Sequence, residues 1–306
     1  MSSGIVHAAL RTDSVWRPKL STAPNASAAG QITLGGDLKV NRLGFGAMRI
    51  TGPGIWGPPA DVPTAVRVLQ RAIQLGVNFI DTADSYGPDV SERIIAQALY
   101  PYPADLVIAT KGGLERAGPD VWTRNGRPQH LREACEGSLR RLQRDRIDLY
   151  QFHSVDPQVP LADSIGELVR LKAEGKIRHL GISNVTLDQL KQAERLTPLV
   201  SVQNRFNLED RRSDAVVAYC AEKSMAFIPW APLDSGRHAQ SSGAVRALGK
   251  IAERHKVSIG NAAIAWLLHI SKAMLPIPGT GSVEHLEENV AAASIRLTPE
   301  EVRELS

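Results

Sequence analysis

The segment NFIDTADSYG, residues 78–87, joins a short apolar run to two side chains that can transfer protons. Its opening residues have the composition of a buried β-strand, and Asp81 ends that run. Tyr86 follows in a polar stretch that closes on a glycine, which is typical of a loop. Functional side chains concentrate on loops that a rigid scaffold positions, so this segment predicts a strand whose carboxyl end carries chemistry.

Two later segments have the same construction. LVIATKGG, residues 106–113, contains a strand pattern that ends at Lys111, and IDLYQFH, residues 147–153, ends at His153. In a parallel sheet the carboxyl ends of the strands meet at one edge, so side chains that follow them can share a pocket. The four side chains predicted to share this pocket are Asp81, Tyr86, Lys111 and His153.

From about residue 31 the sequence alternates strand patterns with helical patterns, as in a parallel sheet with crossover helices. QITLGGDLKV, residues 31–40, has two short apolar runs around two glycines, which predicts a β-hairpin. Eight further runs are predicted strands. They are RLGFG (42–46), NFID (78–81), LVIATK (106–111), IDLYQFH (147–153), IRHLGIS (177–183), LVSVQ (199–203), AFIPW (226–230) and AMLPIP (273–278).

Apolar residues at helical spacing separate these strands. Leu69 and Ile73 belong to one such pattern, which Gly76 ends, and Cys135 belongs to another and is therefore predicted to lie in the core. Eight strands, each followed by a helix, favour an α/β fold of the closed (β/α)8 TIM barrel class, here with an N-terminal hairpin and extra C-terminal helices. A doubly wound sheet is the alternative, but GFGAMR, residues 44–49, does not complete the GxGxxG fingerprint.

The four predicted site residues are chemically complementary. A phenol has an ordinary pKa of about 10, so Tyr86 needs a buried cation beside it to ionise readily. Lys111 supplies that cation, and Asp81 supplies the carboxylate without which a buried ammonium would lose its proton. His153 would hydrogen-bond a substrate oxygen. Because active sites of such barrels lie at the carboxyl ends of the strands, the pattern predicts an enzyme.

Composition excludes several other classes. Hydrophobic residues make up 43% and charged residues 22% of the 306 residues, which is ordinary for a soluble globular protein, and no apolar run is long enough to span a membrane. The net charge of +4 indicates either a solvated surface or attraction of an anionic ligand. Basic residues are spread along the chain without interleaved aromatics, so no nucleic-acid partner is expected. Without CxxC or HExxH spacing, we expect no metal.

The N-terminal segment differs from the rest of the chain. It is rich in Ser, Ala and Pro and has little periodicity, so residues 1–30 are interpreted as a tail and residues 31–306 as a single domain. Arg11, Arg17 and Lys19 faintly resemble the basic pattern of a transit peptide, and a disordered extension is the alternative. The segment has no apolar stretch of the kind that directs secretion, and we expect a cytoplasmic protein.

The aldo-keto reductase superfamily has motifs that resemble three segments of this chain: GVNFIDTADSYG (76–87), IRHLGISNV (177–185) and MLPIPGTGSVEHLEENV (274–290). The resemblance extends over residues 31–306. It implies a barrel that transfers hydride from a reduced nicotinamide to a carbonyl carbon, while Tyr86 donates a proton to the oxygen. RLGFGAMRITGPGIWGPP, residues 42–59, and SYGPDVSE, residues 85–92, resemble a bacterial branch of the superfamily that includes pyridoxal reductases.

The resemblance assigns roles to further residues. The four site residues named above match the catalytic tetrad of the family. Ser183, Asn184 and Gln203 match residues that hold the carboxamide of the nicotinamide. Trp230 stands where the family usually has a Tyr that stacks on the nicotinamide ring, and Trp keeps the aromatic face.

The C-terminal motif departs from the best-known relatives. Many of them carry a Lys and an Arg that bind the 2′-phosphate of NADPH, whereas this chain has Gly279 and His285 at those positions. Thr280, Ser282 and backbone amides near a helix N-terminus remain to hold a phosphate, and Asn289 matches a family residue near the adenine. We expect NADPH, with NADH as the alternative. His285 can also be interpreted as an exposed helical residue.

The substrate is expected to be a small-molecule carbonyl compound, and pyridoxal is the candidate. TGPGIWGPP, residues 51–59, and the long connection at residues 112–127 are predicted to border the pocket. Trp56 and Trp122 are the candidate substrate contacts, although Trp56 can equally pack its own loop.

Two other functions remain open. One is a sugar or polyol dehydrogenase that works in the oxidative direction on the same scaffold. The other is an NADPH-sensing regulatory subunit with slow turnover, against which the intact tetrad argues. We expect a monomer or a weak homo-oligomer.

Overall fold

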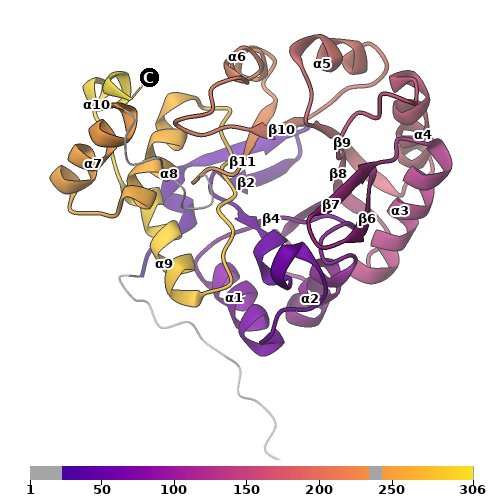
Figure 1. Cartoon of the computed structure of the whole chain (residues 1–306), viewed down its shortest axis with the longest axis horizontal. Helices are drawn as coiled ribbons and strands as arrows, with labels where there is room; N and C mark the ends of the chain where they lie inside the picture. The colour runs from indigo at the N-terminus through magenta and orange to yellow at the C-terminus, as the bar shows by residue number, and fades with distance from the viewer. Residues whose placement is uncertain (1–22, 234–242, 306) are drawn as a thin grey trace, which may run out of the picture.

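The computed structural model describes residues 23–233 and 243–305. Seven strands form a parallel sheet at the centre of the molecule, in the same order in space as along the chain (Figure 1). They are β3 (Phe45–Gly46), β4 (Phe79–Asp81), β5 (Val107–Gly112), β8 (Ile147–Phe152), β9 (Ile177–Ser183), β10 (Ser201–Arg205) and β11 (Ala226–Trp230).

Residues 273–278 close this sheet into a barrel between its two edge strands. On one side the Leu275 N–H donates to the carbonyl of Phe227 in β11, at 2.9 Å. On the other side the Gly44 N–H donates to the Pro276 carbonyl, at 3.0 Å. A regular strand was expected here, but the structure has only an isolated bridge to Phe227, because the segment contains two prolines that cannot donate to a ladder. The predicted (β/α)8 barrel is confirmed.

Helices surround the sheet (Figure 1). Their inward faces form two apolar clusters with the outward faces of the strands, and Cys135 is fully buried in one of them, as predicted. No helix of the described residues is long and apolar enough to cross a membrane. The helices are α1 (Val62–Gln74), α2 (Val90–Leu99), α3 (Pro128–Leu142), α4 (Leu161–Ala173), α5 (Leu187–Glu194), α6 (Asp214–Glu222), α7 (Gly243–His255), α8 (Ile259–Ile270), α9 (Val283–Ala291) and α10 (Pro299–Glu304).

Two antiparallel hairpins are added to the barrel. The predicted N-terminal hairpin is confirmed as β1 (Gln31–Leu34) and β2 (Leu38–Asn41), and its apolar side chains pack in one cluster with the inward side chains of the barrel strands. This packing closes the amino-terminal end of the barrel. The second hairpin, β6 (Leu114–Gly118) and β7 (Val121–Arg124), follows β5 and therefore stands at the opposite rim.

The inside of the barrel changes from apolar to polar along its axis. Phe79 in β4 and Ala109 in β5 belong to the inner apolar cluster. Side chains alternate between the two faces of a strand, so Asp81 and Lys111, two residues further on, point inward as well. The strand period therefore carries the reactive side chains into the barrel at its carboxyl end.

The end of the predicted N-terminal tail packs on the barrel. A 3₁₀ turn at Ala26–Ala29 is tied down by the Ala26 N–H, which donates to the Leu75 carbonyl at 2.8 Å, and by Arg296, which donates to the Ala28 carbonyl. Residues 23–29 are thus in contact with the domain, and residues 1–22 lie outside the described residues.

The closing contact leaves no space for a side chain on Gly46. A Cβ at this position would lie 2.6 Å from the carbonyl oxygen of Ile277. We expect Gly46→Ala to lower the free energy of unfolding by about 1–3 kcal/mol, as overpacked positions do, when measured by urea denaturation. Gly166→Ala in α4 is the control, because a Cβ there meets no atom within 4 Å. Equal unfolding midpoints for the two variants would contradict this account of barrel closure.

Candidate active site

The ammonium group of Lys111 lies inside the barrel with no exposed surface. It donates hydrogen bonds to Asp81 Oδ2 at 2.6 Å and to the Thr82 carbonyl at 2.7 Å, and it lies 3.3 Å from the phenol oxygen of Tyr86. Burial alone lowers the pKa of Lys111, but the charge of Asp81 and the hydrogen bonds to Asp81 and Tyr86 outweigh burial and raise the pKa above its ordinary value. The lysine therefore stays charged beside the phenol.

The phenol of Tyr86 keeps its proton at neutral pH. Burial raises its pKa above 10, and the opposing attraction of Lys111 offsets this only in part. The predicted effect of Lys111 on the phenol is thus present, but burial is the larger influence. Tyr86 is consequently an acid that is protonated at rest. When it loses its proton, the ammonium of Lys111 lies beside the phenolate.

The imidazole of His153 is buried next to the phenol, with ring centres 5.9 Å apart. Burial, and secondarily the charge of Lys111, lowers the pKa of His153 well below 6.5, so the ring is neutral. A neutral imidazole has one N–H donor and one acceptor nitrogen. Ser85 Oγ lies 3.4 Å from Nδ1, which leaves Nε2 for another partner.

The second carboxylate oxygen of Asp81 holds two glutamines. Gln151 Nε2 donates to Asp81 Oδ1 at 3.0 Å, and Gln203 Nε2 donates to the same oxygen at 2.8 Å. Gln203, which was predicted to contact a carboxamide, therefore also orients the carboxylate that holds Lys111. All four side chains are buried.

Asn184 connects two walls of the site. It follows β9 in the left-handed conformation, with φ of 56°, which Asn tolerates better than most residues. Its Nδ2 donates to the His153 carbonyl at 2.9 Å and to Ser183 Oγ at 3.1 Å, while its Oδ1 accepts from Trp230 Nε1 at 2.9 Å. The indole of Trp230 is thereby tied to the strand end that carries His153.

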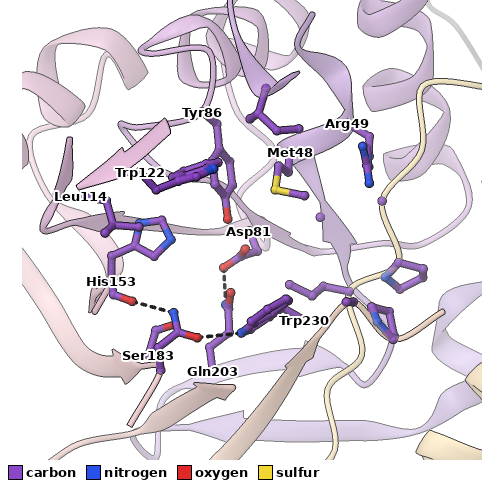
Figure 2. Close-up of a pocket in the computed structure, with 18 of the residues that line it drawn as sticks. Met48, Arg49, Asp81, Tyr86, Leu114, Trp122, His153, Ser183, Gln203 and Trp230 are labelled. Atoms are coloured by element: carbon purple, nitrogen blue, oxygen red, sulfur yellow. Dashed lines mark hydrogen bonds between the residues drawn. The ribbon is translucent and has the colours of Figure 1, made fainter. Parts of the chain in front are cut away.

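A cavity of about 700 Å³ lies at the carboxyl end of the barrel, in front of the buried pair of Lys111 and Asp81 (Figure 2). Aromatic and polar side chains line it, together with residues from the connection after β3 and from the β6–β7 hairpin. The lining residues are Gly46, Met48, Arg49, Gly54, Ile55, Asp81, Tyr86, Leu114, Asp120, Trp122, His153, Ser183, Asn184, Gln203, Trp230, Ala231, Pro232, Leu233, Ile277, Pro278 and Gly279.

The structure places the remaining predicted site residues outside this lining. Thr280 and Asn289 are buried, whereas His285 is exposed in the first turn of α9. Ser282 is the N-cap of α9, where its hydroxyl accepts from the His285 N–H and donates to Glu284. Trp56 forms a backbone bridge with Gly87 next to the cavity. The roles predicted for these residues remain predictions.

Several site residues were not identified from the sequence. Gln151 carried a usable signal, because it lies two residues before His153 and one strand period after an inward leucine. Met48 and Arg49 in the 3₁₀ turn after β3, Leu114 at the start of β6, and Ser85 beside His153 carried none, because they lie outside the strands of the barrel. Within the described residues, no group of three or more His, Cys, Asp or Glu side chains could hold a metal ion.

The chain is similar to known oxidoreductases. The chain is 51% identical over 280 residues to an uncharacterised oxidoreductase of Schizosaccharomyces pombe, covering 92% of this chain and 90% of that protein. It is 40% identical over 271 residues to pyridoxine 4-dehydrogenase of Escherichia coli, covering 87% and 93%.

Solved structures are also similar to this chain. Glycerol dehydrogenase from Gluconobacter oxydans matches with a TM-score of 0.82 and 28% identity, covering 91% of this chain and 94% of that one. An aldo-keto reductase from Klebsiella pneumoniae in complex with NADPH matches with a TM-score of 0.75 and 26% identity, covering 90% and 93%. The family model described as the aldo/keto reductase family matches residues 42–306, and the chain belongs to that family of NAD(P)H-dependent oxidoreductases.

Proposed function

We propose that the protein reduces an aldehyde or ketone to an alcohol with NADPH, and that pyridoxal is among its substrates. The observation that carries the proposal is the phenol of Tyr86, which borders the cavity and lies 3.3 Å from the buried ammonium of Lys111. A protonated acid with a fixed cation behind it is suited to donate a proton to a carbonyl oxygen and then to persist as a phenolate.

Each residue of the site has a separate task in this reaction. Tyr86 donates the proton, and Lys111 stabilises the phenolate that remains. Asp81 keeps Lys111 charged. His153, which is neutral, can donate one N–H to the carbonyl oxygen and so orient it toward the phenol.

The lining of the cavity fits a nicotinamide. Ser183 has a hydroxyl, and Asn184 and Gln203 have amide oxygens, of the kind that hydrogen-bond a carboxamide, and Trp230 presents an aromatic face. The cavity volume lies in the usual range of roughly 300–1,000 Å³ for sites of small molecules and cofactors. When bound, the cofactor supplies the hydride.

NADPH is proposed over NADH on two grounds. The similar Klebsiella pneumoniae reductase is described in complex with NADPH. In this chain the polypeptide runs from the cavity lining at Gly279 directly to the N-terminus of α9, where the helix dipole favours an anion. His285 lies exposed in that first turn.

Pyridoxal is proposed because of a relative and because of the shape of the site. The Escherichia coli relative is named pyridoxine 4-dehydrogenase. In this chain Tyr86, His153 and Trp122 form a group of three rings with centres 5.9–6.5 Å apart, all of which border the cavity. Such a group suits a planar substrate.

Replacing the phenol tests the central claim. Because Tyr86→Phe removes only the acid, we expect kcat for aldehyde reduction to fall by about 10²–10⁴-fold while cofactor affinity, followed by fluorescence titration, stays unchanged. Tyr102→Phe is the matched control, since that hydroxyl donates to the Leu142 carbonyl away from the cavity. Near-normal kcat in Tyr86→Phe would remove Tyr86 from the reaction.

The protonation states predict a flat pH profile. The pKa of Tyr86 is raised above 10, so the acid form needed for reduction persists as pH rises to 9. The pKa of His153 is lowered well below 6.5, so the ring stays neutral as pH falls to 6. We expect kcat for reduction, measured with saturating substrate and cofactor, to be constant between pH 6 and 9. An inflection near pH 6.5 would show that His153 titrates.

A substrate and cofactor screen tests the finer proposals. Oxidation of NADPH and of NADH is followed with pyridoxal, other aromatic aldehydes, ketones and sugars. We expect a higher kcat/KM with NADPH than with NADH, and turnover of pyridoxal. Preference for NADH would contradict the cofactor proposal, and faster oxidation of polyols than reduction of any carbonyl would favour the dehydrogenase alternative.

A further inference from the structure

The guanidinium of Arg116 in β6 uses all of its hydrogen atoms on backbone carbonyls. A guanidinium has five N–H donors. Nε donates within the hairpin, Nη1 reaches the first loop and the loop that carries Tyr86, and Nη2 reaches the first loop and the hairpin turn. The acceptors, with distances, are Val121 (2.9 Å), Ile55 (2.8 Å), Ser85 (3.1 Å), Gly54 (2.8 Å) and Gly118 (3.2 Å).

This bonding pattern determines what Arg116 can do. Because every N–H has a carbonyl partner, none is left to bind an anionic substrate group. The residue instead joins three segments of the rim: the 51–57 loop, the loop before Tyr86, and the β6–β7 hairpin. A lysine has only three donors on one flexible ammonium and cannot reproduce a planar set of five.

The faces of the guanidinium lie against tryptophans. Its central carbon is 3.7 Å from the ring centre of Trp122 and 5.8 Å from that of Trp56. Stacking of this kind is attractive and orients the indole. The two tryptophans that the sequence singled out as substrate contacts are thus both placed by one arginine, and only Trp122 borders the cavity.

Trp122 in turn meets the reactive side chains. Its ring centre lies 6.4 Å from that of Tyr86 and 6.5 Å from that of His153, with edge-to-face geometry in both pairs. It is 37% exposed, so part of its surface remains available to a substrate. Figure 2 shows the indole beside the phenol and above the imidazole, on the hairpin side of the cavity.

A second set of backbone contacts fixes the same wall. The Asp120 N–H in the hairpin turn donates to the Gly54 carbonyl at 3.0 Å, and the Gly57 N–H donates to the Gly87 carbonyl at 2.7 Å. Gly54 adopts a φ of 65°, and a Cβ there would collide with Pro119 in the turn. The loop and the hairpin turn therefore interlock.

We propose that Arg116 is a positioning residue that holds Trp122 over Tyr86 and His153, and that this wall makes the enzyme selective for flat, ring-bearing carbonyl substrates. The inference deepens the proposed function and rests on it. It assigns selectivity to a hydrogen-bonded hairpin, separate from the residues that carry out the proton transfer. Contact of an indole with a substrate ring is expected to change selectivity by roughly tenfold or more.

The test compares kcat/KM for pyridoxal with kcat/KM for propanal, which has no ring, in wild type and in Arg116→Gln, Arg116→Lys and Trp122→Ala. Arg124→Gln is the control, because Arg124 is an exposed arginine in the same hairpin that does not border the cavity. Hydrogen–deuterium exchange of residues 51–57 and 114–124, measured without cofactor, reports on the wall independently of activity.

We expect Arg116→Gln to lower the pyridoxal-to-propanal ratio by about tenfold, mainly through KM for pyridoxal, while kcat for propanal stays within about twofold of wild type. Both loop segments should exchange faster in this variant. Trp122→Ala should lower the ratio to a similar degree, and the double variant no further, because both changes remove one contact. Arg116→Lys should also have a lower ratio than wild type, because lysine cannot reproduce the five hydrogen bonds.

Three results would overturn the inference: an unchanged ratio in Arg116→Gln, an equal loss for both substrates, or exchange no faster than in Arg124→Gln. None of these results would contradict the proposed function, as long as the wild-type protein reduces carbonyl compounds. A wild-type protein that reduces no carbonyl compound would instead refute the proposed function, and the inference with it.

Discussion

A positive charge with no exposed surface lies at the carboxyl end of the barrel, and the surrounding site keeps it there. Burying an ion costs about several kcal/mol even after the protein relaxes, so it needs close partners. Lys111 has Asp81 at 2.6 Å, and the other oxygen of Asp81 holds Gln151 and Gln203. Removing one partner of a buried pair costs about 3–5 kcal/mol. Lys111, Asp81 and the two glutamines form one hydrogen-bonded unit behind Tyr86.

Burial acts in opposite directions on the two groups that face the substrate. It raises the pKa of Tyr86 and lowers the pKa of His153, so both are neutral donors near pH 7. Among the four predicted catalytic side chains, only Lys111 and Asp81 are charged, and they neutralise each other at rest. Negative charge appears on the phenol only when the proton leaves, and the ammonium is already in place to stabilise it, without reorganisation during the reaction.

Strand periodicity explains how much of this could be predicted. The alternation of side chains along a strand points Phe79 and Ala109 into the barrel, and it points Asp81 and Lys111, two residues further on, the same way. These positions therefore follow from the sequence pattern and the barrel. The contacts of Arg116 do not follow from it. They depend on loop conformations such as the positive φ of Gly54 and of Asp120, which no periodicity records. The eighth strand, residues 273–278, was predicted to be regular, but the structure has only an isolated bridge there, because its prolines disrupt the ladder.

The site therefore divides between strands and loops. Asp81, Lys111 and His153 lie at strand ends that the barrel holds, and Tyr86 lies in the loop after β4. The wall facing the substrate lies on the hairpin and the first loop. Arg116 hydrogen-bonds only main-chain oxygens, in the hairpin, the first loop and the loop before Tyr86, so its contacts do not depend on which side chains these segments carry. A frame of this kind allows loop side chains to change the shape of the cavity without disturbing the pair of Lys111 and Asp81. Substrate choice and catalytic power can consequently vary independently on this barrel.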